Sequence, residues 1–302
     1  MPKRVQDIDI MDEMVARGHL PILPAGMRLY AIGDMHGRKD HFDVLMQQII
    51  EDNNLRGSPG RQGTHIVGLG DYIDRGMESK ALIDFFLHPM PSSFHWHFIG
   101  GNHETAMINI FSSSPRKITA ETLSDWLSRY GGRETMISYG VEAHVIDKAA
   151  ENLKSKHVTQ NFIDKLLMAW RARIPPSHFE FLFSLPDSLQ FGDYFFAHAG
   201  IRPGITLNKQ KSDDLRRIRG EFLRDKSDHG AVIVHGHSMK PEPQIRSNRI
   251  GIDTGAYTPS GRLTVLGLEG GSRWLMASGR PGFIGAEALK QGPLPSISKA
   301  FY

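Results

Sequence analysis

The stretch GDMHGRKDH, residues 33–41, follows a short apolar run of strand character. In it, Asp34 and His36 lie one residue apart between two glycines, where the chain must turn. The same arrangement recurs at GDYIDRG, residues 70–76, and at GNHE, residues 101–104, each after another short apolar run. In open α/β sheets, ligands gather beyond the carboxyl ends of strands. The repetition therefore predicts one site built from three strand ends.

The segments around these motifs predict the organisation of the chain. Residues 39–53 and 78–87 place apolar side chains on one helical face, so the first hundred residues alternate strand and helix. Residues 105–185 have helical patterns, in which Trp126 and Trp170 lie on apolar stripes and are interpreted as core. Strands are predicted at 194–197, 231–234, 249–252 and 262–268. We expect a single domain over 1–302, with a core at about 27–277, a helical insertion at about 105–185 and peripheral ends.

Composition limits what the chain can be. Its 302 residues are 40% hydrophobic and 23% charged, which suffices for a buried core. The chain has no cysteine, which excludes thiolate metal sites and cysteine nucleophiles. No run approaches the ~18 apolar residues of a membrane span, and the start lacks the apolar segment of a signal peptide, so a cytoplasmic protein is expected. The net charge of +3 mildly favours anionic partners, but no nucleic acid or membrane is expected.

The second half of the chain adds more polar side chains at strand ends. FFAHAG places His198 after one apolar run, and VIVHGHS places His235 and His237 after another. Carboxylate oxygens and neutral imidazoles without sulfur suit manganese, iron or zinc better than calcium. Two such ions about 3.5–4 Å apart can act on both sides of a phosphoryl displacement. The side chains that could converge are Asp34, His36, Asp71, Asn102, His103, His198 and His237.

These motifs, in this order, resemble the phosphoprotein phosphatase family within the calcineurin-like metallophosphoesterases, above all its short bacterial members. The resemblance runs from about residue 29 to 269 and includes WLSRYGGRETMISYG and IDTGAY. It implies an α/β sandwich of two mixed β-sheets flanked by helices, with a dimetal site at the carboxyl ends of strands. It implies two divalent ions, with Mn²⁺ expected to serve in vitro.

The resemblance also assigns roles to individual residues. It implies that Asp34 and His36 hold the first metal, that Asp71 bridges, and that Asn102, His198 and His237 hold the second. It gives no role to His235, for which a structural placement is expected. Glu104 is expected to be a structural residue of the GNHE turn.

The remaining roles follow from the chemistry of phosphoester hydrolysis. A hydroxide held by the two metals attacks phosphorus directly, so no protein nucleophile is needed. Guanidinium groups bind the phosphoryl oxygens, and Arg75 and Arg219 are the candidates, the latter from the resemblance. Arg216 and Arg217 are interpreted as a solvated basic loop. Tyr257 is expected at the edge of the cleft.

His103 is predicted to be the general acid. It follows Asn102 directly, so it can reach the leaving-group oxygen while its neighbour holds a metal. Asp74 is expected to orient the imidazole and to favour its protonated form.

The substrate class leaves alternatives open. The leading hypothesis is a protein phosphatase that acts on phosphoserine or phosphothreonine, and potentially phosphotyrosine, in a phosphoprotein or phosphopeptide. The main alternative is a bis(5'-nucleosyl)-tetraphosphatase, which shares the fold, metals and mechanism. Such enzymes typically have GDLVARG and GNHD, whereas this chain has Asp74 and Glu104. A non-catalytic binding module is disfavoured because the whole set of ligands is present, and an RNA-end phosphatase has only the basic pI in its favour.

Overall fold

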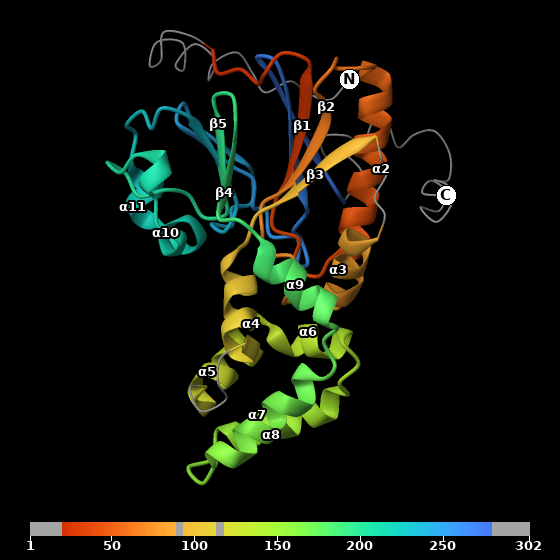
Figure 1. Cartoon of the computed structure of the whole chain (residues 1–302), viewed down its shortest axis with the longest axis vertical. Coiled ribbons are helices and arrows are strands. Elements are labelled where there is room, and N and C mark those ends of the chain that lie inside the picture. The colour runs from red at the N-terminus through yellow and green to blue at the C-terminus, as the bar shows by residue number, and fades with distance from the viewer. Residues whose placement is uncertain (1–19, 89–92, 113–117, 280–302) are drawn as a thin grey trace.

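Two five-stranded sheets form the centre of the molecule (Figure 1). The structure is a computed structural model and describes residues 20–88, 93–112 and 118–279. The first sheet has the order β10 (Ser272–Ala277), β9 (Thr264–Glu269), β1 (Met27–Ile32), β2 (Gly63–Gly68) and β3 (Phe94–Phe98). The second has the order β4 (Ser188–Phe191), β5 (Tyr194–Ala197), β6 (Val232–His235), β8 (Arg249–Gly251) and β7 (Gln244–Ile245).

Both sheets are mixed. Strands β1, β2 and β3 run parallel, as do β5, β6 and β8, while β9, β10, β4 and β7 add antiparallel pairs at the edges. The parallel strands therefore end on the same side of each sheet, and the loops that follow them carry the motifs. The predicted sandwich of two mixed sheets is confirmed.

Helices cover the outer faces of the two sheets (Figure 1). On the first sheet, α2 (Lys39–Arg56) and α3 (Ser79–Leu87) bury Phe42 and Leu82 in one cluster with Tyr30 of β1. On the second sheet lie the 3₁₀ turn η3 (Leu207–Lys209), α10 (Ser212–Arg217) and α11 (Gly220–Arg224). There Phe222 packs with Phe195 of β5. Apolar side chains on one face of each helix thus seal the sheets from water.

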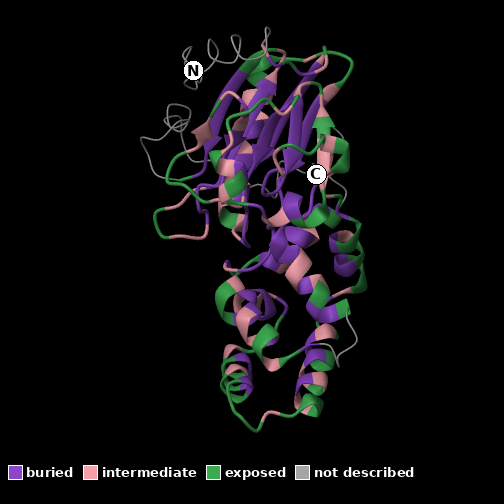
Figure 2. Cartoon of the chain, turned by 90° about the vertical axis from the view of Figure 1, so that its left-hand side faces the viewer, coloured by how far each residue is buried: buried purple, intermediate pink, exposed green. Residues whose placement is uncertain are grey.

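A third apolar cluster lies between the two sheets. Leu29 and Val67 of the first sheet and Phe196 of the second are fully buried in it, and Figure 2 shows how strongly burial concentrates on the strands. Leu23 also belongs to this cluster, and its backbone N–H donates to Gly270. The described part of the predicted peripheral N-terminal segment is therefore anchored to the core, while residues 1–19 and 280–302 lie outside the described residues.

The part of the chain that connects β3 to β4 is helical, as predicted, and forms a lobe at one end of the two sheets (Figure 1). Thr119 and Thr159 cap two of its helices by accepting backbone N–H bonds with their hydroxyls, and Trp126 and Trp170 are buried, as expected. Its elements are α4 (Asn102–Ser112), α5 (Ala120–Asp125), the π-helical turn η2 (Trp126–Tyr130), α6 (Gly132–Ser138), α7 (Ala143–Leu153), α8 (Gln160–Arg171) and α9 (Pro176–Ser184). None of the helices in the described ranges is long and apolar enough to cross a membrane.

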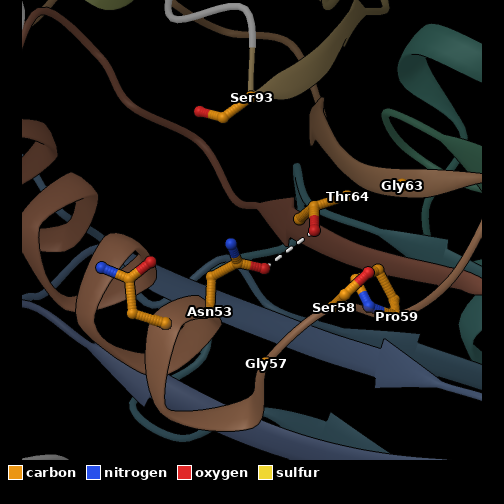
Figure 3. Close-up of a pocket in the computed structure, with 8 residues that line it drawn as sticks. Asn53, Gly57, Ser58, Pro59, Gly63, Thr64 and Ser93 are labelled. Carbon is orange, nitrogen blue, oxygen red and sulfur yellow. Dashed lines mark hydrogen bonds between the residues drawn. The ribbon is translucent and has the colours of Figure 1, made fainter.

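A cavity of about 380 Å³ lies at the start of β2, beside the end of α2 (Figure 3). In its wall, the Asn53 side-chain oxygen accepts hydrogen bonds from Thr64 and Arg28, both at 2.8 Å. The motif loops follow the opposite, carboxyl ends of the strands. This cavity is therefore separate from the predicted site.

Candidate metal centre

The three motifs of the first half lie together at the carboxyl ends of β1, β2 and β3. Glu104, in the first turn of α4, ties two of them to each other. Its buried carboxylate accepts backbone N–H bonds from Asp71 at 2.9 Å, Tyr72 at 2.8 Å and Gly101 at 2.9 Å. The structural role expected for Glu104 agrees with this geometry, although the residue lies in a helix and not in a turn.

The second sheet brings its histidines to the same place. His198 directly follows β5 and His237 follows β6, and their rings are 5.0 Å apart. The nitrogen Nε2 of His198 lies 3.3 Å from Asp71 Oδ1 and 3.0 Å from the side-chain oxygen of Asn102. The two sheets therefore contribute to one cluster, although Asn102 and His198 are 96 positions apart in the chain.

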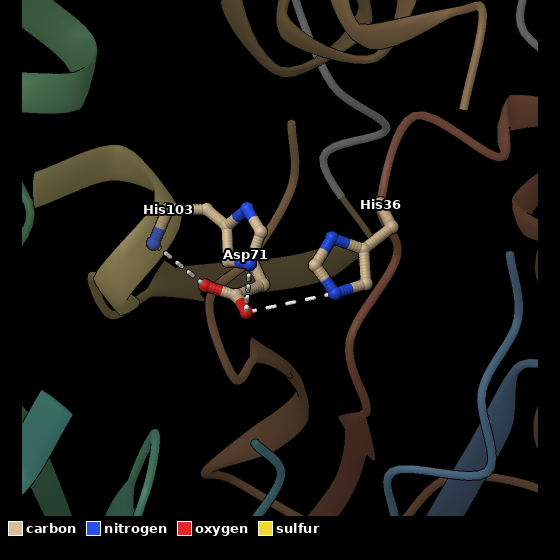
Figure 4. Close-up of side chains that lie close together, drawn as sticks. All are labelled: His36, Asp71 and His103. Atoms are coloured by element: carbon tan, nitrogen blue, oxygen red, sulfur yellow. Dashed lines mark hydrogen bonds and ion pairs between the residues drawn. The ribbon is translucent and has the colours of Figure 1, made fainter. Parts of the chain in front are cut away.

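Asp71 is at the centre of this cluster. Its other carboxylate oxygen, Oδ2, lies 3.6 Å from Nε2 of His36 and 3.7 Å from Nε2 of His103 (Figure 4). Two groups of side chains consequently have ligand atoms close enough together for a metal ion. They are His36, Asp71 and His103, and Asp71, His198 and His237. Asp71 is common to both groups, which is the position expected of a bridging carboxylate.

Hydrogen bonds orient the imidazoles for metal binding. Nδ1 of His36 donates to the carbonyl of Ile73 at 3.0 Å, and Nδ1 of His198 donates to the carbonyl of Leu69 at 2.8 Å. Both rings therefore direct Nε2 toward Asp71, the arrangement that backbone carbonyls impose on metal-ligating histidines. The buried Nε2 of His237 makes no hydrogen bond within the part of the chain that the structure describes.

The protonation of these groups suits a cation. Burial lowers the pKa of His36 well below its usual value and that of His237 to about 2, so both are neutral. Burial also lowers the pKa of His198, but the carboxylates of Asp71 and Asp34 outweigh this effect and raise the pKa to about 10. A divalent cation would neutralise the same negative charge and would compete with the proton on His198.

Asp34 and Asn102 lie beside these two groups. The Asp34 carboxylate accepts the backbone N–H of His237 at 2.9 and 3.2 Å, which links the first motif to the last. Burial raises its pKa, and the nearby carboxylate of Asp253 adds to the rise. Asp253 is a buried acid of the IDTGAY motif that the sequence analysis did not single out. The donor set of carboxylate, amide and imidazole groups fits two divalent ions of intermediate hardness.

The backbone of the centre is strained. Among the described residues, the non-glycine residues with positive φ are His36 at 44°, Asp71 at 52°, Asp74 at 70°, Arg75 at 69° and His237 at 59°. Each such conformation costs about 1–3 kcal/mol when the surrounding structure imposes it on a side chain that disfavours it. All five belong to the motifs, so the strain is concentrated where the predicted chemistry lies.

His103 and Asp74 form the predicted pair. Nδ1 of His103 donates to Asp74 Oδ2 at 2.8 Å, and both side chains are buried. Burial lowers the pKa of His103, but the carboxylates of Asp71 and Asp74 outweigh this and raise it above its usual value. Thr135 and Trp126 of the helical lobe also bond Asp74, at 2.7 and 3.2 Å. The sequence analysis missed these two roles because Trp126 fits an apolar stripe and Thr135 has no distinguishing pattern.

Arg75 and Tyr257 lie together beside His36. The Arg75 guanidinium is 4.2 Å from the centre of the Tyr257 ring, and this ring contacts the ring of His36 edge-on at 5.1 Å. Arg219 is exposed at the start of α11, and its charge contributes to the low pKa of His237. Arg75 and Arg219 thus place positive charge beside both groups of ligands.

Two arginines and one histidine near the motifs bond or pack with other parts of the protein and lie outside the two groups of ligands. The expectation that Arg216 belongs to a solvated loop is wrong. Arg216 lies in α10, bonds Asp187 at 2.6 Å and Thr105 at 2.9 Å, and so joins the second sheet to the helical lobe. Arg217 donates to the hydroxyl of Tyr130 at 3.2 Å. His235 is buried against Phe222, outside both groups of ligands, which agrees with a structural placement.

Comparison with known proteins identifies the class to which this fold and centre belong. Residues 27–257 match the model of the calcineurin-like phosphoesterase family, and the chain is a member of that family. The chain is therefore an enzyme, a metallophosphoesterase.

Two curated relatives have names that state a more specific activity than the family does. The bis(5'-nucleosyl)-tetraphosphatase PrpE (asymmetrical) of Geobacillus thermodenitrificans is 24% identical over 80% of this chain and 90% of its own. The protein of the same name from Oceanobacillus iheyensis is 26% identical over 76% of this chain and 84% of its own. Among solved structures, that of a proposed diadenosine tetraphosphatase matches 87% of this chain and 100% of its own, with a TM-score of 0.53 and 15% identity, and supports the fold.

Proposed function

We propose that this metallophosphoesterase hydrolyses bis(5'-nucleosyl) tetraphosphates with two divalent ions. The observation that carries the reaction type is the position of Asp71, whose two oxygens face imidazoles from both sheets. The substrate class is supported by the two curated relatives, which resemble this chain over most of its length. Both relatives favour the alternative of the sequence analysis over its leading hypothesis of a protein phosphatase.

The proposal gives each group a task. His36, Asp34 and Asp71 would hold one ion, and Asp71, Asn102, His198 and His237 the other, with manganese, iron or zinc as the ions that suit these donors. When bound, the two ions supply an activated water and neutralise phosphoryl charge. Arg75 and Arg219 would bind the phosphate oxygens, and stacking on Tyr257 would hold the Arg75 guanidinium in place.

His103 would hold a proton at Nε2 and give it to the leaving oxygen. Asp74 bonds the opposite nitrogen, Nδ1, and so fixes the ring with Nε2 directed into the centre. His103 also stands in one of the two groups of ligands, because its Nε2 approaches Asp71. We assign it to proton transfer because its Nδ1 is bonded to a second buried carboxylate, whereas those of His36 and His198 are bonded to carbonyls.

One observation favours a protein phosphatase as the second candidate. The buried His103–Asp74 pair matters most for a leaving group that needs a proton, such as the alkoxide of serine. A nucleotide phosphate, with a second pKa of about 6, leaves without much help. A device of this kind is therefore better suited to a phosphoserine or phosphothreonine peptide.

A competition of substrates tests the proposal. The manganese-loaded protein is assayed on diadenosine tetraphosphate and on phosphoserine, phosphothreonine and phosphotyrosine peptides, with Asp71→Asn as the inactive control. A higher kcat/KM for the dinucleotide is expected. A preference for a phosphopeptide would replace the proposed substrate by the second candidate, and turnover that Asp71→Asn retains in full would contradict the assignment of the centre.

A further inference from the structure

The carboxylate of Asp74 is held on both of its oxygens. Oδ2 receives Nδ1–H of His103 at 2.8 Å and the indole N–H of Trp126 at 3.2 Å, and Oδ1 receives the hydroxyl of Thr135 at 2.7 Å. The same Thr135 oxygen accepts the backbone N–H of Asp74 at 2.9 Å. Asp74, Trp126 and Thr135 are each at most 1% exposed, so water does not compete for these bonds.

The helical lobe supplies the donors, and an irregular helix places them. Trp126 begins the π-helical turn η2, and Thr135 lies in α6 directly after it. A π-helical turn is rare and is often found at functional sites. Gly131, at φ 83°, ends the turn, and its carbonyl accepts the backbone N–H of Arg75 at 3.1 Å.

The turn also requires a glycine at its exit. The indole of Trp126 packs on Gly132 so closely that a Cβ there would lie 2.3 Å from the ring. The ring also makes an edge contact with Phe111, with the ring centres 5.5 Å apart. Trp126 is therefore held in one orientation, with its N–H toward Asp74, which apolar packing alone does not require.

We propose that Trp126 and Thr135 are positioning residues for proton transfer, through which the helical lobe sets the orientation of His103. The inference rests on the proposed function, in which His103 protonates the leaving oxygen. Asp74 has a left-handed backbone and contacts His103 through one carboxylate oxygen only, so nothing in that single bond fixes the carboxylate plane. The two donors from the lobe fix that plane and thereby the direction of Nε2 of His103.

The inference implies that different parts of the chain position the metal ligands and the general acid. The loops that follow the strands hold the proposed ligands of the metals, whereas two donors that hold the Asp74 carboxylate come from the helical lobe. Loosening the support should therefore leave metal binding intact and reduce turnover in proportion to the need for a proton. This differs from a role of the lobe in substrate binding, which would change all leaving groups alike.

Two nearly isosteric substitutions test the inference. Trp126→Phe removes the indole N–H and keeps an aromatic ring, and Thr135→Val removes the hydroxyl and keeps the shape. Thr135→Ser restores the hydroxyl, and Trp170→Phe is the matched control for a buried tryptophan of the same lobe. The substrates are phenyl phosphate and p-nitrophenyl phosphate, which have similar size and charge but differ in how much the leaving oxygen needs a proton.

General acid catalysis is worth about 10²–10⁴-fold, so partial misorientation should cost about tenfold in kcat on phenyl phosphate. On p-nitrophenyl phosphate the loss should be about twofold or less, because protonation contributes little there. Thr135→Ser should recover most of the loss, Trp170→Phe should behave as wild type, and metal content should stay unchanged. His103→Asn is measured beside them and should show the same selectivity more strongly.

A second readout does not involve turnover. In ¹⁵N-labelled protein, the indole N–H resonance that Trp126→Phe removes is assigned to Trp126, and Asp74→Asn should shift it while the Trp170 resonance stays in place. Equal losses on both substrates, or no loss, in Trp126→Phe and Thr135→Val would overturn the inference if His103→Asn remains selective. If His103→Asn itself shows no selectivity, the acid role within the proposed function fails and the inference fails with it.

Discussion

Replacement of Glu104 by glutamine should destabilise the protein although it changes a single atom. Oε2 of Glu104 accepts the backbone N–H groups of Asp71 and Gly101, and Oε1 accepts those of Tyr72 and, at 3.4 Å, Ile73. A glutamine can present an oxygen to one side only, so its NH₂ group must face backbone N–H groups on the other. Two buried donors then lose their acceptor, whichever way the amide faces.

The magnitude follows from these bonds. Hydrogen bonds to charged groups are worth about 1.5–3 kcal/mol each, and a buried donor left unsatisfied costs a similar amount. The substitution Glu104→Gln should therefore lower the free energy of unfolding by about 3–6 kcal/mol, a large fraction of the 5–15 kcal/mol typical of a folded protein. Because Asp71 is held through its own N–H, the affinity for metal should fall as well.

Urea unfolding of the metal-free protein measures the first effect, and titration with Mn²⁺ measures the second. Glu151→Gln is the matched control, since Glu151 is exposed on α7. It should change stability by no more than about 0.5 kcal/mol, as surface substitutions do. A loss below about 1 kcal/mol in Glu104→Gln would refute the reasoning, because it would mean that the buried carboxylate does not hold the two motifs together.

The other predictions concern the metals and the acid. Exhaustive chelation should abolish hydrolysis and Mn²⁺ should restore it, and full turnover by a protein verified as metal-free would contradict the proposal. Asp71→Asn should lower metal occupancy and activity together, which elemental analysis checks, and two tightly bound metals in that variant would exclude a bridging role. His103→Asn should cost about 10²–10⁴-fold on a phosphoserine peptide but much less on p-nitrophenyl phosphate, with both metals retained. Loss of one metal and equal loss on both substrates would make His103 a ligand. Asp74→Asn should show the same preference more mildly.

The positions of the central strands along the chain could be predicted because their patterns are local, whereas their order in the sheets could not. The strand at 194–197 has the predicted limits, and β6, β8 and β9 differ from theirs by one or two residues. The strands β4, β7 and β10 were not predicted. Strand β4 has only partly buried side chains, and β7 has two residues, so neither has a clear pattern. Pairing with a neighbour, and not local sequence, makes them strands.

The candidate site could be predicted in its members but not in all of its connections. A motif of glycine, carboxylate and imidazole after an apolar run is visible in one chain, and four of the six expected ligands, His36, Asp71, His198 and His237, belong to the two groups whose ligand atoms lie close together. The bonds from Trp126 and Thr135 to Asp74 depend on how a helical lobe packs against a loop about fifty residues earlier in the chain. The same holds for Arg216, whose partners Asp187 and Thr105 lie on other elements. Contacts of this kind leave no periodic signature in the sequence.

The backbone of the centre explains why local propensity fails there. A turn that needs positive φ favours glycine or asparagine, yet the chain has histidine, aspartate and arginine at five such positions. Glycine would relieve the strain at each of them but would remove the imidazole, carboxylate or guanidinium that faces the centre. Hydrogen bonds such as those of Glu104 to the Asp71 and Tyr72 amides offset part of the cost. The chemistry of the side chain therefore determines which residue occupies each of these positions, and the surrounding packing and hydrogen bonds stabilise the strained backbone.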